Sequence, residues 1–202
     1  MEGKKMTNVL IIGATGTVGS AVRQTLNRET NANITLFARS AGRITPGDRE
    51  TAIAGNVSKD DDLDNAIEGQ DVVFVALSGN LGNFARKIVQ SMDRNNVSRL
   101  IFITSMGIYN EIPASLGGGN VSENPMLRSY RDAADVIEAS DLNYTIIRPG
   151  WFTNGPVDYE ITRKGEPFGG HNVSVSSIAD FAKNAIADEN YYSHDSVGLN
   201  TK

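Results

Sequence analysis

Apolar runs and helical patterns alternate along the chain from its beginning to its end. Continuous apolar runs predict parallel strands buried on both faces, and apolar residues spaced three or four apart predict amphipathic helices between them. The expected strands are 8–12, 33–38, 51–57, 72–77, 99–104, 143–148 and, as a last edge strand, 196–200. The expected helices begin near Val18 and then cover 60–68, 84–95, 125–140 and 177–188. This alternation predicts an α/β fold, a Rossmann-type doubly wound and mainly parallel sheet with helices on both faces.

Two segments break the rhythm. Residues 105–124 have no clean period and contain three consecutive glycines, and residues 150–175 begin with a stretch interrupted by Gly and Pro. Long loops inside a compact domain are usually functional or disordered. We therefore expect both to be substrate-side loops of one NAD(P)-binding domain that spans residues 1–202.

Composition narrows the class of partner. The chain is 40% hydrophobic and 21% charged, with a net charge of −5, which argues against nucleic acid or an anionic membrane as a partner. It has no cysteine and two histidines, so we expect no metal site. No stretch approaches the ~20 apolar residues of a membrane span, so we expect a cytoplasmic protein. The sequence does not distinguish a monomer from a homodimer.

The first expected strand runs into a glycine motif that opens the first helix. Gly13 lets the chain turn off the strand, Gly16 lets a pyrophosphate approach the backbone, and Gly19 lets the helix pack close to the strand. The helix N-terminus then faces the anion. The alternative is a plain Gly-rich turn before a helix; the order of strand, glycines and helix favours dinucleotide binding. The cofactor contacts expected here are Gly13, Thr15, Gly16, Thr17 and Val18.

The end of the second strand indicates which dinucleotide binds. Dinucleotide folds selective for NAD carry an acidic residue about 20 residues past the glycines. Here Arg39 and Ser40 occupy that place, and no carboxylate follows until Asp48. Arg39 is either a solvated surface residue or, as its position favours, a charged fork for the ribose phosphate, with Ser40 adding a hydroxyl. We therefore expect NADP(H) as the cofactor.

With these residues in view, the chain resembles the atypical short-chain dehydrogenases/reductases of the NmrA-like, NAD(P)H-binding family. That group includes flavin/biliverdin reductases and quinone reductases. The resemblance rests on the glycine motif at 13–19, on Arg39, and on segments 55–57, 103–105 and 144–150. It implies contacts to adenine from Asn56 and Val57, to ribose from Leu77, Ser78 and Gly79, and near the nicotinamide from Thr104, Ser105, Pro149, Gly150 and Trp151.

The chain departs from this family at the proton relay. Standard members carry Tyr-x-x-x-Lys on the helix after the fifth strand, where the ammonium lowers the phenol pKa. Here Tyr130 is followed by Ala134 at the lysine position. Ser105 and Tyr130 remain the catalytic candidates. Ser105 either bonds a substrate carbonyl or satisfies local backbone, and Tyr130 is either an acid or a packing residue.

Two functions from different classes fit this departure. One is an NADPH-dependent oxidoreductase that reduces a flat conjugated small molecule, such as a quinone or a flavin. Trp151 and Phe152 would then form an apolar wall for the acceptor, unless they pack in the core. The other is a non-catalytic NADP(H)-binding redox sensor. His171 lies in a segment that either overhangs the site or is merely structural.

Overall fold

The computed structural model describes residues 6–202, and one large sheet runs through its centre. The strands of this sheet are β1 Asn8–Ile12, β2 Asn33–Ala38, β3 Glu50–Ala54, β4 Val72–Val75, β5 Arg99–Ile103, β6 Asn143–Pro149, β8 Glu160–Arg163 and β10 Asp195–Asn200. Their order is β3-β2-β1-β4-β5-β6-β10-β8, and all pairs are parallel except β10 with β8. A second, two-stranded sheet joins β7 Trp151–Thr153 to β9 Asn172–Ser174.

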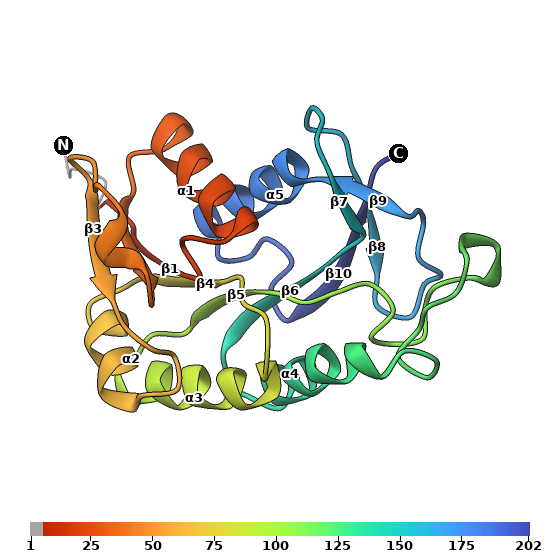
Figure 1. Ribbon diagram of the computed structural model, residues 1–202, viewed down its shortest axis with the longest axis horizontal. Coiled ribbons are helices and arrows are strands. Elements are labelled where there is room, and N and C mark those ends of the chain that lie inside the picture. The colour runs from red at the N-terminus through yellow and green to blue at the C-terminus, as the bar shows by residue number, and fades with distance from the viewer. Residues whose placement is uncertain (1–5) are drawn as a thin grey trace.

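Helices cover both faces of the large sheet (Figure 1). They are α1 Thr17–Glu29, α2 Asp60–Ile67, α3 Leu81–Arg94, α4 Arg128–Glu138 and α5 Val175–Ala187. Helices α1 and α5 lie on one face, and α2, α3 and α4 lie on the other. This arrangement confirms the predicted doubly wound α/β fold.

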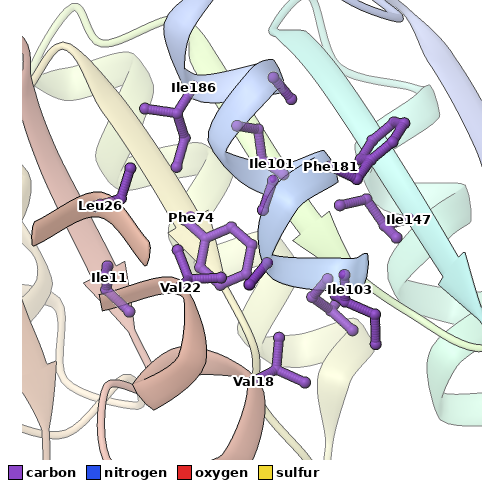
Figure 2. Packing of buried hydrophobic residues seen from close by; sticks show 14 of the residues in the cluster. Ile11, Val18, Val22, Leu26, Phe74, Ile101, Ile103, Ile147, Phe181 and Ile186 are labelled. Atoms are coloured by element: carbon purple, nitrogen blue, oxygen red, sulfur yellow. The ribbon is translucent and has the colours of Figure 1, made fainter. Parts of the chain in front are cut away.

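The strands divide their side chains between two cores. Along β1, Val9 and Ile11 enter the core under α1 and α5, while Leu10 and Ile12 enter the core on the opposite face. This alternation follows from the two-residue period of a strand. Figure 2 shows the first core, in which Val22 of α1 and Phe181 of α5 pack over the apolar side chains of the central strands. Because both faces are buried, the strands read as continuous apolar runs.

The C-terminal third differs from the sequence expectation in two respects. Segment 150–175 is not a plain loop, because it contains β7, β8 and β9. Strand β10 is not an edge strand, because it lies between β6 and β8. The sheet edge is β8 instead, and its four residues, two of them exposed, form no continuous apolar run.

Smaller differences concern element ends. Helix α3 begins at Leu81 rather than at residue 84, because the Asn80 side chain accepts from the Asn83 N–H and caps the helix. The fourth helix opens with a 3-10 turn, Pro125–Leu127, before α4. Segment 105–124 stays irregular apart from one 3-10 turn, Ala114–Leu116. None of the helices within residues 6–202 is long and apolar enough to cross a membrane.

Candidate functional site

A cleft of about 500 Å³ opens where the strand order reverses, between the carboxyl ends of β1 and β4. In open α/β sheets this switch point is the usual ligand site. The cleft brings together nine residues that the sequence assigned to the cofactor, namely Gly13, Thr15, Gly16, Arg39, Ser40, Asn56, Val57, Leu77 and Ser78. It also includes Ile12, Phe37, Ala38, Gly55, Ser58, Ala76 and Phe84, which the sequence reading did not assign.

The three glycines of the first loop have different constraints. Gly13 has φ +91°, and a Cβ there would lie 2.0 Å from the Ala76 carbonyl oxygen. A Cβ on Gly19 would lie 2.2 Å from the Gly13 carbonyl oxygen. Gly16 has an ordinary φ of −79°, and the nearest atom to its Cβ position is at 3.4 Å. The fold therefore requires Gly13 and Gly19, whereas the space above Gly16 is open.

The N-terminus of α1 presents a positive end to this cleft. Gly16 is its N-cap residue, and none of the described side chains caps the helix there. The first turn, which begins Thr17-Val18-Gly19, holds no acidic residue. The unpaired N–H groups and the helix dipole favour an anion at this point. The Val18 side chain is buried in the core, so Val18 could contact an anion only through its backbone.

The end of β2 supplies a cationic rim. Arg39 and Ser40 line the cleft, and they also line an adjoining hollow of about 430 Å³ together with Gly42, Arg43 and Ala54. The Ser40 hydroxyl donates to the Thr15 hydroxyl at 3.2 Å, which connects this rim to the glycine loop. Within residues 6–202, neither arginine forms an ion pair. Two unpaired guanidinium groups beside one hollow suit a phosphate.

The carboxyl end of β3 is held by a side chain from α2. The Asn56 N–H donates to Asp62 Oδ2 at 2.8 Å, and the Ser58 N–H donates to Asn56 Oδ1 at 2.9 Å. These bonds fix residues 55–58 against the cleft. The acidic start of α2 thus has a structural role, and no three His, Cys, Asp or Glu side chains within residues 6–202 gather as metal ligands would.

The residues expected near the nicotinamide lie at the next strand ends, outside the cleft lining. The Met106 N–H donates to the Pro149 carbonyl, which ties the chain after β5 to the end of β6. Ser105 Oγ donates to the Met106 carbonyl at 3.1 Å, so its hydroxyl satisfies local backbone in this state. Thr104 is buried, and its hydroxyl donates to the Ile147 carbonyl. Thr17, Gly79, Gly150 and Trp151 also lie outside the lining.

Trp151 and Phe152 are surface residues rather than core residues. Trp151 is 65% exposed and Phe152 is 49% exposed, on the short strand β7 directly after β6. The alternative of core packing is therefore wrong. The Trp151 ring stacks on His171 with the centroids 6.2 Å apart and the planes 16° apart. The stacked pair lies at the carboxyl end of β6, and the exposed indole supplies its apolar face.

Two tyrosines near the first substrate-side loop, Tyr130 and Tyr109, are held by packing and by a hydrogen bond. Tyr130 packs against the core beneath the sheet, and Ala134, one turn later on the same face of α4, is fully buried there. Tyr109 donates to Glu138 Oε1 at 2.7 Å, and burial raises the pKa of its phenol. A phenol with a raised pKa is a weaker proton donor near neutral pH.

A buried ion pair holds the first substrate-side loop to the sheet. Arg148 of β6 is fully buried and pairs with Glu111. The same carboxylate accepts the Gly107 N–H at 3.0 Å and the Tyr109 N–H at 2.8 Å. The sequence placed Arg148 in the segment 144–150 that carries the family resemblance and assigned it no partner. An arginine inside an apolar strand was the available signal, because a buried charge needs a partner.

Comparisons with known proteins agree with this geometry. A family model described as NAD(P)H-binding matches residues 13–189. A Rossmann-fold NAD(P)-binding family protein from Shigella flexneri is 35% identical, with a TM-score of 0.83 over 98% of this chain and 94% of that one. A short-chain dehydrogenase/reductase from Veillonella parvula, solved in complex with NADP, is 29% identical, with a TM-score of 0.88 over 96% and 94%.

More distant structures share the fold alone. ChuY, described as an anaerobillin reductase from Escherichia coli O157:H7, is 17% identical, with a TM-score of 0.79 over 96% of each chain. Comparison with curated proteins gave no match. The sequence resemblance to NAD(P)H-binding proteins is thus confirmed at the level of family and fold.

Proposed function

Because the chain belongs to the NAD(P)H-binding family, we propose that it is an NADPH-dependent oxidoreductase that reduces a flat conjugated small molecule, such as a quinone or a flavin. Membership of the NmrA-like group and a cytoplasmic location are part of this proposal. Its partner would be a small-molecule acceptor rather than nucleic acid or a membrane.

The cofactor assignment follows from the shape and charge of the cleft. The open space above Gly16 and the uncapped end of α1 suit a pyrophosphate. Arg39 and Arg43 beside the adjoining hollow suit the extra phosphate of NADPH. The Veillonella parvula protein, which was solved in complex with NADP, supports the same assignment. The adenosine half would then lie over β1, β2 and β3, and the nicotinamide half would extend toward β5 and β6.

The single observation that carries the acceptor class is the exposed Trp151 beside the end of β6. Strands lie about 4.8 Å apart, so the end of β6 is about 10 Å from that of β4, on the nicotinamide side. An indole face there would hold a flat ring parallel to the nicotinamide, which is the orientation that hydride transfer needs. Such an acceptor stabilises the anion formed by hydride transfer. A simple ketone does not, so it needs a proton donor as the alkoxide forms. Ala134 stands where a lysine would lower the pKa of the Tyr130 phenol.

The test is NADPH oxidation, followed by absorbance, with menadione, FMN and acetone as acceptors. We expect turnover with menadione or FMN and little with acetone. Trp151→Ala should lower kcat/KM about tenfold, since a stacked aromatic contact contributes ~0.5–1.5 kcal/mol beyond its buried area. Met6→Ala, an exposed apolar residue just before the amino end of β1, is the matched control. Tight NADPH binding without turnover on any acceptor would instead favour the redox sensor.

A further inference from the structure

His171 is fixed against the segment that directly follows β6. The Trp151 N–H donates to the His171 carbonyl at 2.8 Å, and β7 pairs with β9 from Trp151 and Asn172 onward. A Cβ on Gly150 would lie 2.5 Å from the same carbonyl oxygen, so only glycine permits this close approach. The segment before β9 is thereby brought to the nicotinamide side of the sheet.

The imidazole of His171 has a defined orientation. One face stacks on Trp151, and Nδ1 lies 2.7 Å from Asn172 Oδ1. An amide oxygen only accepts hydrogen bonds, so Nδ1 carries a proton in this contact. Nε2, at the opposite edge of the exposed ring, has no hydrogen-bond partner among residues 6–202. When the ring is charged, Nε2–H is a free donor at the edge of the Trp151 surface.

The direct partners of this ring are neutral. Its packing partners are Trp151 and Asn172, and no charged side chain of the described chain bonds to it. Two charged residues come close to this segment of the chain. Glu160 of β8 accepts from Asn200 Nδ2 at 2.7 Å and faces Gly169, and Lys202 follows Thr201, whose N–H donates to the Asn172 carbonyl. Histidine is the side chain that ordinarily titrates between pH 5 and 8. Because Nε2 is free, the ring can take up or release a proton at that atom without losing its hydrogen bond to Asn172.

We propose that His171 is the general acid of the reductase, a role that rests on the proposed function. Bound NADPH would supply a hydride, with its two electrons, to a quinone, and this would leave NADP⁺ and a hydroquinone monoanion. The Nε2–H bond of the imidazolium then breaks as an O–H bond forms on that anion. The product is the neutral hydroquinone, and the imidazole takes its proton back from water.

The other hydroxyls of this region are less suited to the step. Ser105 Oγ–H is engaged with the Met106 carbonyl, Tyr109 donates to Glu138, and Tyr130 lies on the core face of α4. His171 differs because it joins a free donor atom to the flat surface on which the acceptor would lie. It would thus supply the proton that Tyr-x-x-x-Lys supplies in standard members of the family.

The experiment compares His171→Asn with His194→Asn in the full-length protein. His194 lies by the amino end of β6, where its ring meets Tyr144 edge-on, and its φ of +53° is one that asparagine adopts readily. With menadione, we expect His171→Asn to lower kcat about 100-fold with little change in KM for NADPH. His194→Asn should match the wild type. With FMN the loss should be much smaller, because the reduced flavin anion is a weaker base than a hydroquinone anion.

Two further readouts separate a proton donor from a structural residue. A rate that depends on a protonated imidazole should fall with rising pH, and His171→Asn should lose this dependence. Added imidazole should restore turnover to His171→Ala. If His171→Asn keeps the wild-type kcat and pH profile, or if imidazole does not restore turnover to His171→Ala, then His171 is not the general acid. The reductase proposal would stand in that case. Absence of turnover by the wild type would overturn the reductase proposal as well.

Discussion

A single methyl group at Gly16 should separate folding from cofactor binding. The backbone there is ordinary, with φ −79°, and the nearest atom to a Cβ lies at 3.4 Å, so Gly16→Ala fits the fold without a clash. Alanine restricts the unfolded chain, which stabilises by about 0.4–1 kcal/mol, and it is a poorer N-cap than glycine, which costs a similar amount. The melting temperature should therefore stay within about 2–4 °C of the wild type.

Binding should respond quite differently. The methyl group would stand where the pyrophosphate approaches the N-terminus of α1, and it would displace at least one N–H to phosphate hydrogen bond. Such a charge-assisted bond contributes about 1.5–3 kcal/mol, so NADPH affinity should fall about 10- to 100-fold.

Calorimetric titration with NADPH measures this directly, alongside thermal unfolding. Gly47→Ala is the matched control, because its Cβ would meet only the Glu50 side chain at 3.6 Å, before the amino end of β3. Gly13→Ala should unfold the protein instead, since its Cβ would collide with the Ala76 carbonyl. Unchanged NADPH affinity in a folded Gly16→Ala variant would refute the assignment of this loop to the pyrophosphate.

Three other perturbations address the phosphate, the partly buried Arg23–Glu50 ion pair and the buried Arg148–Glu111 ion pair. Arg39→Asp should weaken NADPH by at least tenfold in calorimetry and leave NADH nearly unchanged, with Arg28→Asp as a surface control; equal wild-type affinities for the two would refute the NADP preference. Hydrogen bonds from Arg23 lower the pKa of the Glu50 carboxyl to about 2, so its stabilisation exists above the unfolded value near 4.3 and is lost as pH falls toward 2. Glu50→Gln should thus cost about 2–3 kcal/mol of unfolding free energy at pH 7 and almost nothing at pH 2, whereas a cost independent of pH would contradict this linkage. Glu111→Gln leaves Arg148 buried without its countercharge and should cost about 3–5 kcal/mol in denaturant unfolding; a loss below 1 kcal/mol would contradict its role.

The sequence predicted the fold well because the central strands are buried on both faces. Apolar runs such as Val72–Val75 and the glycine motif are local signals, and their order along the chain determines a doubly wound sheet. The same logic located most of the cleft, since the residues that follow parallel strands meet at one edge. Phe84 was not assigned because it lies inside the expected helix 84–95 and not directly after a strand.

The remaining features depend on contacts between distant residues. Strands β7 and β9 have three residues each, too few to show a period, and they pair across the whole 150–175 segment. Glu111 and Arg148 are 37 positions apart, so neither pattern alone predicts the ion pair. The stacking of Trp151 on His171 arises from the same pairing of β7 with β9. The sequence indicated both residues as candidates but did not predict their contact.

The most direct measurement of reductase function is a single turnover with labelled cofactor. The full-length protein, in excess over NADPH, is mixed with menadione, and NADPH loss and hydroquinone formation are followed together. If the protein is a reductase, NADPH disappears in equal amount to the hydroquinone formed, and deuterium on the transferred position of C4 slows the step. If NADPH binds tightly and remains unoxidised with both menadione and FMN, the protein does not transfer hydride to this class of acceptor.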